Sequence, residues 1–162
     1  MDFEVRRGSP DDIERLEPLW EALRNHHVTL PAMPAVRTLE ASWVYRKRQY
    51  LEWLGQDDYT LLVAARDGEL IGYAVVSLGD GAATWDLGER TAEIETLSVL
   101  ESERGNGVGR ALTDAAAEVA GEAGVGTMLV GVAHSNEGAI RFYEREGFED
   151  FYVLLVRGRS QD

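Results

Sequence analysis

The distribution of apolar residues along the chain distinguishes predicted strands from predicted helices. Short runs rich in apolar residues and bounded by turn residues predict strands. These predicted strands cover residues 3–6, 59–65, 70–78, 91–100, 127–133 and 151–156. Apolar residues spaced three and four apart predict helices over residues 10–24, 38–54, 110–123 and 137–146. The order of these elements predicts an α/β fold, with a mixed, twisted sheet flanked by about four helices.

Capping and turn residues define several of these boundaries. Ser9 followed by Pro10 is typical of the N-cap and first position of a helix. Asp67-Gly68, between two predicted strands, indicates a tight hairpin turn. Gly121 or Gly124 is expected to end the third helix.

The length of the chain predicts a single domain over residues 1–162, because 162 residues with 44% hydrophobic content can form one substantial core. We expect residues 158–162 to be a loose tail. The sequence contains no apolar run long enough to span a membrane. Its first residues do not resemble a secretory signal, so we expect a cytoplasmic protein with no membrane partner.

The charge balance excludes several classes of partner and site. Sixteen basic against 29 acidic residues give a net charge of −13, which argues against nucleic acid binding. An acidic surface favours the approach of a cationic amine, although solubility alone also accounts for it. The chain has no cysteine, which excludes disulfides, thiolate metal sites and a cysteine-bound acyl intermediate. Its three histidines show no metal-ligand spacing, so no metal is expected.

A glycine-rich segment, Arg104-Gly105-Asn106-Gly107-Val108-Gly109, lies between a predicted strand and a predicted helix. Such a turn presents unpaired N–H groups at a helix start, where a phosphate can bind. The P-loop pattern requires Gly-Lys-Ser/Thr, and this chain has Gly109-Arg110-Ala111. The dinucleotide fingerprint G-x-G-x-x-G is not met either, because the spacing here is G-x-G-x-G. An NAD- or ATP-dependent enzyme is therefore a less supported alternative.

Two motifs together resemble the GNAT family of N-acetyltransferases. The R-G-x-G-x-G segment after Leu97-Ser98-Val99 is similar to that family's coenzyme A loop. Residues 136–148 resemble its next motif, N-x-x-A-x-x-x-Y-x-x-x-G-F. The motifs start about 30 residues apart, which leaves room for a βαβ unit. The resemblance covers residues 59–157 and implies a GNAT-like fold and acetyl transfer from acetyl-CoA to a primary amine.

The resemblance also implies roles for individual residues. The backbone of residues 104–109 would bind the pyrophosphate of acetyl-CoA, and Leu97, Ser98 and Val99 would pair with the pantetheine arm as an added strand. Asn136 matches a position that contacts the arm. Tyr143 matches the tyrosine that acts as general acid on the departing thiolate. The full set of implied cofactor-binding residues is Leu97, Ser98, Val99, Arg104, Gly105, Asn106, Gly107, Val108, Gly109, Asn136 and Tyr143.

Glu93 and Glu95 are the candidate general bases. They lie two residues apart, so in a regular strand they share a face. Carboxylates are costly to bury in a sheet, which points to a function unless this end of the strand is solvated. The resemblance favours Glu93, but a bulge would change which residue faces the site, and the family also contains members that use neither.

The acceptor amine is not defined by any motif. The helix pair in the first 54 residues occupies the place where the GNAT family builds its acceptor pocket, and Trp20, His26, His27 and Trp43 are candidates to line it. For each of them individually, core packing or a satisfied surface histidine is the favoured explanation. We expect a small-molecule or peptide amine that attacks directly in a ternary complex, and a homodimer is compatible with the fold. A catalytically silent acyl-CoA sensor of the same fold is the alternative function.

Overall fold

The computed structural model describes residues 2–158, and a five-stranded sheet in the order β1-β2-β3-β4-β5 forms its centre. The strands are β1 Glu4–Arg7, β2 Tyr59–Arg66, β3 Glu69–Asp80, β4 Arg90–Val99 and β5 Met128–Val130. The pairs β1–β2, β2–β3 and β3–β4 are antiparallel, whereas β5 runs parallel to β4. The sheet is therefore mixed, as the sequence predicts.

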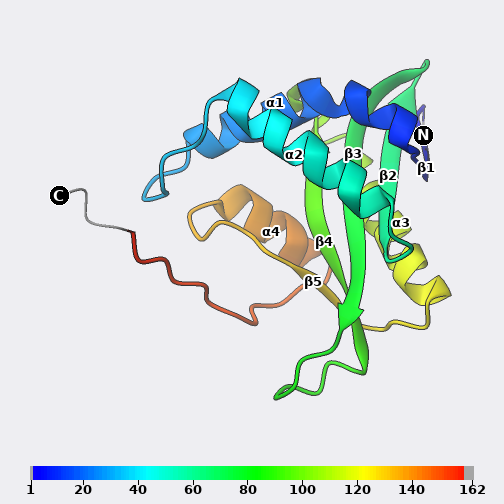
Figure 1. Ribbon diagram of the computed structural model, residues 1–162, viewed down its shortest axis with the longest axis vertical. Coiled ribbons are helices and arrows are strands. Elements are labelled where there is room, and N and C mark those ends of the chain that lie inside the picture. The colour runs from blue at the N-terminus through cyan, green and yellow to red at the C-terminus, as the bar shows by residue number, and fades with distance from the viewer. Residues whose placement is uncertain (1, 159–162) are drawn as a thin grey trace.

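Four α-helices cover the two faces of this sheet (Figure 1). They are α1 Glu17–Val28, α2 Leu39–Leu54, α3 Val108–Glu122 and α4 Glu137–Arg145. Side chains alternate across the strands, so Leu61 and Val63 of β2 pack on the side of α1 and α2, while Leu62 and Ala64 pack on the side of α3. None of the helices within residues 2–158 is long and apolar enough to cross a lipid bilayer.

The first predicted helix is in fact two elements. A 3₁₀ helix, η1 Pro10–Leu16, is followed by α1, which begins at Glu17 and continues to Val28. Pro18 explains the break, because proline has no N–H and its ring clashes with the carbonyl four residues earlier. In the first turn of a helix the backbone N–H groups have no acceptor within the helix, so Pro18 removes no hydrogen bond from α1.

The predicted strand at residues 151–156 is wrong. Residues 151–158 belong to no strand, and the side chains of residues 151–156 are 50–87% exposed. This segment leaves the sheet after α4 and extends outward (Figure 1). Of the predicted loose tail, only residue 158 is among the described residues.

Strand β5 is also shorter than predicted, covering Met128–Val130 rather than residues 127–133. Its pairing with β4 ends at Ile94, directly before an irregular residue of β4. Elsewhere the local signals are confirmed: Asp67 and Gly68 form the β2–β3 turn with φ of 51° and 84°, and Gly124, with φ of 71°, follows the end of α3.

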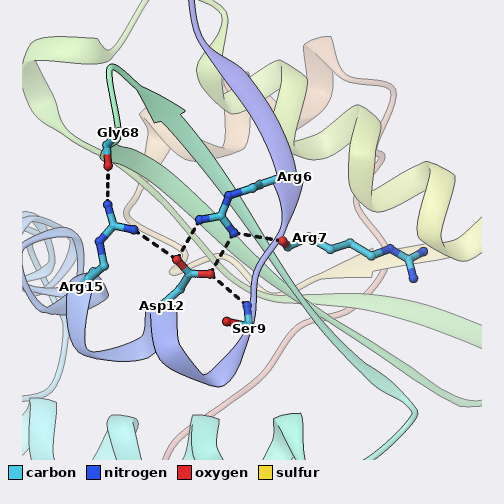
Figure 2. A network of polar contacts seen from close by, with 6 residues as sticks. All are labelled: Arg6, Arg7, Ser9, Asp12, Arg15 and Gly68. Carbon is cyan, nitrogen blue, oxygen red and sulfur yellow. Dashed lines mark hydrogen bonds and ion pairs between the residues drawn. The ribbon is translucent and has the colours of Figure 1, made fainter.

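A buried carboxylate, Asp12, connects η1 to the sheet (Figure 2). Arg6 of β1 donates two hydrogen bonds to it at 2.9 and 2.8 Å, and the backbone N–H of Ser9 donates a third at 3.0 Å. Arg15 contacts the same carboxylate at 3.3 Å and also donates to the carbonyl of Gly68 in the β2–β3 turn. The Arg6 hydrogen bonds lower the pKa of Asp12 to about 2.

Asp12→Asn is expected to lower the free energy of unfolding at neutral pH by on the order of 2 kcal/mol. Because the folded-state pKa is depressed, this stabilisation is present above about pH 4 and is lost as the pH falls towards 2. Urea unfolding at pH 7 and about pH 3 measures it, and the difference between wild type and variant should shrink at the lower pH. Asp11→Asn, on the exposed neighbour, is the control. An equal difference at both pH values would contradict the assignment.

Candidate active site

The loop between β4 and α3, together with the first turn of α3, contains three glycines that serve two purposes. Gly105 and Gly107 have φ of 80° and 85°, a left-handed conformation that favours glycine, and Gly107 is the N-cap of α3. At Gly109, in the first turn of the helix, an added Cβ would lie 3.2 Å from the ring of Phe142 in α4. The first two glycines thus allow the sharp turn, and the third allows α3 and α4 to lie close together.

The start of α3 presents backbone N–H groups that have no acceptor within the described residues. The N–H groups of Arg104 and Asn106 donate to carbonyls of the short 3₁₀ turn Glu101–Glu103. Those of Gly105 and of residues 107–110 donate no hydrogen bond within residues 2–158. Together with the positive end of the helix dipole, these donors can hold a phosphate.

Strand β5 pairs with β4 only over the first part of β4, from Ala92 to Ile94, and a bulge in β4 follows. The β5 pairing covers three residues of β4 and ends at Ile94. On the other side of β4, Val76 of β3 faces Ile94 and Val75 faces Thr96, so Glu95 is the extra residue of a β-bulge. A bulge disrupts the ladder, and beyond it β4 has no partner on the β5 side among the described residues.

The free edge of β4 turns particular backbone groups away from β3. The N–H of Leu100 donates to the carbonyl of Ile71 in β3 at 3.0 Å. Because N–H directions alternate along a strand, the N–H of Ser98 also faces β3, whereas those of Leu97 and Val99 face the unpaired edge. This edge can therefore pair with an extended ligand that carries amide groups.

The two candidate base carboxylates meet beside one serine of β3. Glu93 faces Ser77 in the register, and the hydroxyl of Ser77 donates to Glu95 Oε1 at 2.6 Å. Tyr59 of β2 faces Ser77 from the other side, so Tyr59, Ser77 and Glu93 form a row across the sheet. The expectation that both glutamates share a face is compatible with this geometry.

Burial raises the pKa of Glu93, and the charge of Glu95 raises it further. The carboxylate of Glu95 accepts the Ser77 hydrogen bond, whereas Glu93 makes no side-chain hydrogen bond within residues 2–158. A carboxylate with a raised pKa holds a proton more strongly, as a general base requires. Of the two glutamates, Glu93 is thus the one with its oxygens available.

Three buried hydroxyl groups form a chain beside the bulge. The hydroxyl of Tyr50, from α2, donates to Thr96 Oγ1 at 2.8 Å and lies 3.1 Å from the hydroxyl of Tyr73 in β3. Burial raises the pKa of both tyrosines, so both stay neutral. This chain of hydroxyl groups attaches α2 to β4 at Thr96, the residue that follows Glu95.

Tyr50→Phe is expected to lower the free energy of unfolding by about 1–3 kcal/mol, because the hydroxyls of Thr96 and Tyr73 stay buried and lose their partner. Urea unfolding of the purified variant measures the change. Tyr45→Phe is the matched control, since Tyr45 lies on the same helix and is 46% exposed. Equal unfolding midpoints for wild type and Tyr50→Phe would show that the hydrogen bonds among these hydroxyl groups contribute nothing to stability.

Tyr143 is almost completely buried near the end of α4. Its ring packs against Phe142 and Phe148, with centroids 5.0 and 5.4 Å away. Burial raises the pKa of Tyr143 to about 12, so the hydroxyl keeps its proton at neutral pH. It can therefore donate a hydrogen bond or a proton, as the sequence motif predicts.

Asn136 forms the N-cap of α4, about two turns before Tyr143. Its Oδ1 accepts from the N–H of Ala139 at 3.2 Å and lies 3.3 Å from His26 Nε2. The contact with His26 connects the C-terminal end of α1 to the start of α4. Asn136 is buried, which fits a positioning role beside any ligand contact.

The four candidate acceptor residues do not form one cluster. Trp20 and Trp43 are buried in the core beneath α1 and α2, and Trp20 Nε1 donates to Ser42 Oγ at 2.9 Å. His26 contacts Asn136. His27, whose pKa is lowered by burial, lines a separate hollow of about 280 Å³. Acceptor binding by these residues therefore stays a prediction.

Arg46 is a further residue near the site that the sequence analysis does not single out. Its guanidinium lies over the rings of Trp20, Tyr50 and Trp53, at 4.8, 5.6 and 5.8 Å from their centroids. Cation–π packing explains why this arginine is half-buried. The i, i+4 and i, i+7 spacings to Tyr50 and Trp53 are the signal that could have identified it.

Ser77 is the other residue that the sequence analysis does not single out. It is the one serine or threonine in the otherwise apolar stretch of β3, and a lone hydroxyl in such a strand is a usable signal. The site thus combines a phosphate cradle, an unpaired strand edge, a buried tyrosine and two carboxylates. No group of three or more metal-ligating side chains within residues 2–158 is arranged to hold an ion.

Comparison with known proteins gives a consistent result. The sequence model described as the acetyltransferase (GNAT) family matches residues 20–148. A streptothricin acetyltransferase from Streptomyces lavendulae is 36% identical over 92 residues, which are 57% of this chain and 45% of that protein. A mycothiol acetyltransferase from Propionibacterium freudenreichii subsp. shermanii is 32% identical over 140 residues, 85% of this chain and 40% of that protein.

Among solved structures, the aminoglycoside N-acetyltransferase AAC(6')-Iy in complex with CoA has a similar fold. The match has a TM-score of 0.76 and 21% identity, and covers 98% of this chain and 95% of the other. The chain spans about half the length of the curated relatives that it matches. The region matched by the family model includes both the glycine loop and the N-cap of α4.

Proposed function

Since this chain belongs to the GNAT family of acetyltransferases, we propose that it transfers the acetyl group of acetyl-CoA to a primary amine. The observation that carries the proposal is the combination of free N–H groups at the start of α3 with the unpaired edge of β4. The pyrophosphate of acetyl-CoA can bind to these N–H groups, and its amide-containing pantetheine arm can pair with the strand edge. The two sites are joined by one loop of the chain, as the two parts are joined in the ligand.

The residues of the loop fit this ligand. N–H groups of Gly105 and residues 107–110 are available to the pyrophosphate, and Gly105 and Gly107 carry no side chain that would block its approach. The backbone of Leu97 and Val99 pairs with the amides of the arm, which needs no particular side chain. Asn136, the N-cap of α4, is assigned to contact the arm, and Tyr143 of the same helix is assigned to the thioester sulfur.

Acetyl transfer to an ammonium requires two proton transfers, one from the amine and one to the departing thiolate. The acceptor arrives as an ammonium, and Glu93 takes one proton, through a water molecule, so that the nitrogen lone pair can attack the thioester carbonyl carbon. The N–H of Leu97 stabilises the negative charge on the carbonyl oxygen. The C–S bond then breaks, and Tyr143 donates its proton to the departing thiolate. Glu95, held by Ser77, is the alternative base.

The transfer is direct, from donor to amine within a ternary complex. The chain has no cysteine that could carry the acetyl group as a thioester. The carboxylates of Glu93 and Glu95, within a chain of net charge −13, attract a cationic acceptor. The relatives named for streptothricin, mycothiol and aminoglycosides support a small-molecule amine as the acceptor class.

Thiol release from acetyl-CoA, measured with a thiol-reactive dye across a panel of amines, tests the proposal. The panel includes aminoglycosides, polyamines, amino acids and peptides, and the cysteine-free protein contributes no background signal. We expect release that depends on the amine and is fastest with small cationic amines. CoA binding, measured by calorimetry, without release from any amine would favour the acyl-CoA sensor. Absence of CoA binding would overturn both functions.

A further inference from the structure

The hydroxyl of Ser77 lies beside two carboxylates and donates its proton to only one of them. Glu93 stands opposite Ser77 in the register of β3 with β4, and residues directly opposite each other are the usual partners across a sheet. The hydrogen bond nevertheless goes to Glu95 Oε1, at 2.6 Å. A serine hydroxyl has a single proton to donate, so Glu93 is left without this donor. The contact thus distinguishes two glutamates that are otherwise chemically alike.

Glu95 depends on this contact for the position of its side chain. It is the extra residue of the β4 bulge and has no opposite residue in β3, so the regular ladder does not fix the direction in which it points. Among the described residues its carboxylate accepts no other side-chain hydrogen bond and joins no ion pair. The residue is half-buried, so a carboxylate released from Ser77 can turn towards solvent.

Ser77 makes no other side-chain hydrogen bond that would explain its presence in the sheet. It is the one serine or threonine of β3 and is only 9% exposed. Burying a hydroxyl costs free energy unless the group is hydrogen-bonded, and alanine or valine would fill this strand position without that cost. In the part of the chain that the structure describes, the contact with Glu95 is what offsets the burial of the hydroxyl.

We propose that Ser77 is a positioning residue, which holds the carboxylate of Glu95 and thereby leaves Glu93 as the base of the transfer reaction. The inference rests on the proposed function and concerns the same site. Glu95, held by Ser77, supplies a negative charge at a fixed place beside Glu93. Without the hydroxyl, Glu95 is free to rotate, and either carboxylate can take the proton from the amine.

The surroundings of the two glutamates leave Glu95 as the charge that Ser77 controls. Other ionisable side chains lie around them, namely Tyr59 and Asp58 at the start of β2, Arg90 at the start of β4, and Tyr50 and Arg46 on α2. Burial raises the pKa of both tyrosines, so both stay neutral. Arg90 pairs with Asp58 at 2.6 Å, and β5 contributes no charged residue. None of these groups contacts Ser77 through a side-chain hydrogen bond within residues 2–158.

Carbon-13 NMR of the glutamate carboxyl groups, titrated against pH, tests the position of Glu95 without any acetyl transfer. The Glu93 signal is assigned by its loss in Glu93→Gln. We expect a lower titration midpoint for Glu93 in Ser77→Ala, because burial still raises its pKa but the charge of Glu95 acts on it less. Ser77→Thr keeps the hydroxyl and should keep the wild-type midpoint. Thr91→Val is the matched control, since it removes another buried hydroxyl of β4 and should also leave the midpoint unchanged.

A double variant tests whether the loss of Ser77 lets Glu95 replace Glu93. The values of kcat/KM from thiol release at pH 7 are compared for Glu93→Gln and Glu93→Gln/Ser77→Ala. We expect the double variant to be faster by at least about tenfold, a partial recovery of what a general base contributes. Adding Glu95→Gln should remove this recovery, and Ser77→Thr in place of Ser77→Ala should not produce it. A merely structural role of Ser77 would make the double variant equal or slower.

The two tests separate this proposal from the proposed function. An unchanged Glu93 midpoint in Ser77→Ala would overturn the proposal. A double variant no faster than Glu93→Gln, in a protein that transfers acetyl groups, would overturn it as well. A wild type that acetylates no amine would refute the proposed function instead, and the NMR titration would still decide whether Ser77 holds Glu95.

Discussion

Glu93→Gln is expected to lower kcat/KM for the amine by roughly 10²–10⁴-fold at pH 7, because glutamine has nearly the same shape but cannot take a proton. The affinity for CoA should stay within a few-fold, since the proposed phosphate and arm contacts use the backbone of the loop and of β4. Thiol-release rates give the first quantity and calorimetry the second. The loss should shrink with amines of low pKa, which are already neutral at the assay pH.

The pH dependence identifies which glutamate is the base. The pKa of Glu93 is raised by burial and by the charge of Glu95, so wild-type kcat/KM should fall as the pH drops through that raised pKa. Glu95→Gln removes the neighbouring charge, lowers the pKa of Glu93 and moves this acidic limb to lower pH, with most of the activity retained. If Glu95→Gln abolishes transfer and Glu93→Gln does not, Glu95 is the base.

Tyr143→Phe is expected to lower kcat by about 100-fold or more, because the departing thiolate loses its proton donor. With a pKa of about 12, Tyr143 stays protonated across the usual assay range, so the wild type should show no alkaline limb from this residue. The loss should become smaller with acetyl thioesters whose thiols are more acidic, since a better leaving group needs less assistance.

Tyr152→Phe is the matched control for Tyr143→Phe. It removes the same hydroxyl from a tyrosine that is 75% exposed and should leave the rate unchanged. A Tyr143→Phe defect that is the same for every leaving thiol would contradict the general-acid role. It would indicate instead that the hydroxyl positions the ring between Phe142 and Phe148.

Local sequence signals were sufficient to predict the elements that form the proposed cofactor site. The glycines at 105 and 107 have the left-handed φ that the glycine-rich turn requires, and Asn136, a residue type typical of N-caps, caps α4. The Asp67-Gly68 turn is confirmed for the same reason: a two-residue hairpin depends on residues that tolerate positive φ. Such features depend on a few neighbouring residues, so they can be inferred without the tertiary structure.

Features that depend on contacts between distant residues could not be inferred in this way. The bulge at Glu95 is defined by the register with β3, and the sequence of β4 alone shows only two glutamates two apart. The chain of Tyr50, Thr96 and Tyr73 joins three elements that are far apart in the sequence. The segment of residues 151–156 was predicted as a strand from its composition, but a strand also needs an edge to pair with, and composition does not show where that edge is.

The free edge of β4 has a consequence for hydrogen exchange in solution. The amides of Ser98 and Leu100 face β3 and should exchange slowly with deuterium in the absence of ligand, through opening of the sheet. The amides of Leu97 and Val99, on the same strand, should exchange far faster and become protected when CoA is added. Alternate residues of one strand would then report two different events, the stability of the sheet and the occupancy of its edge.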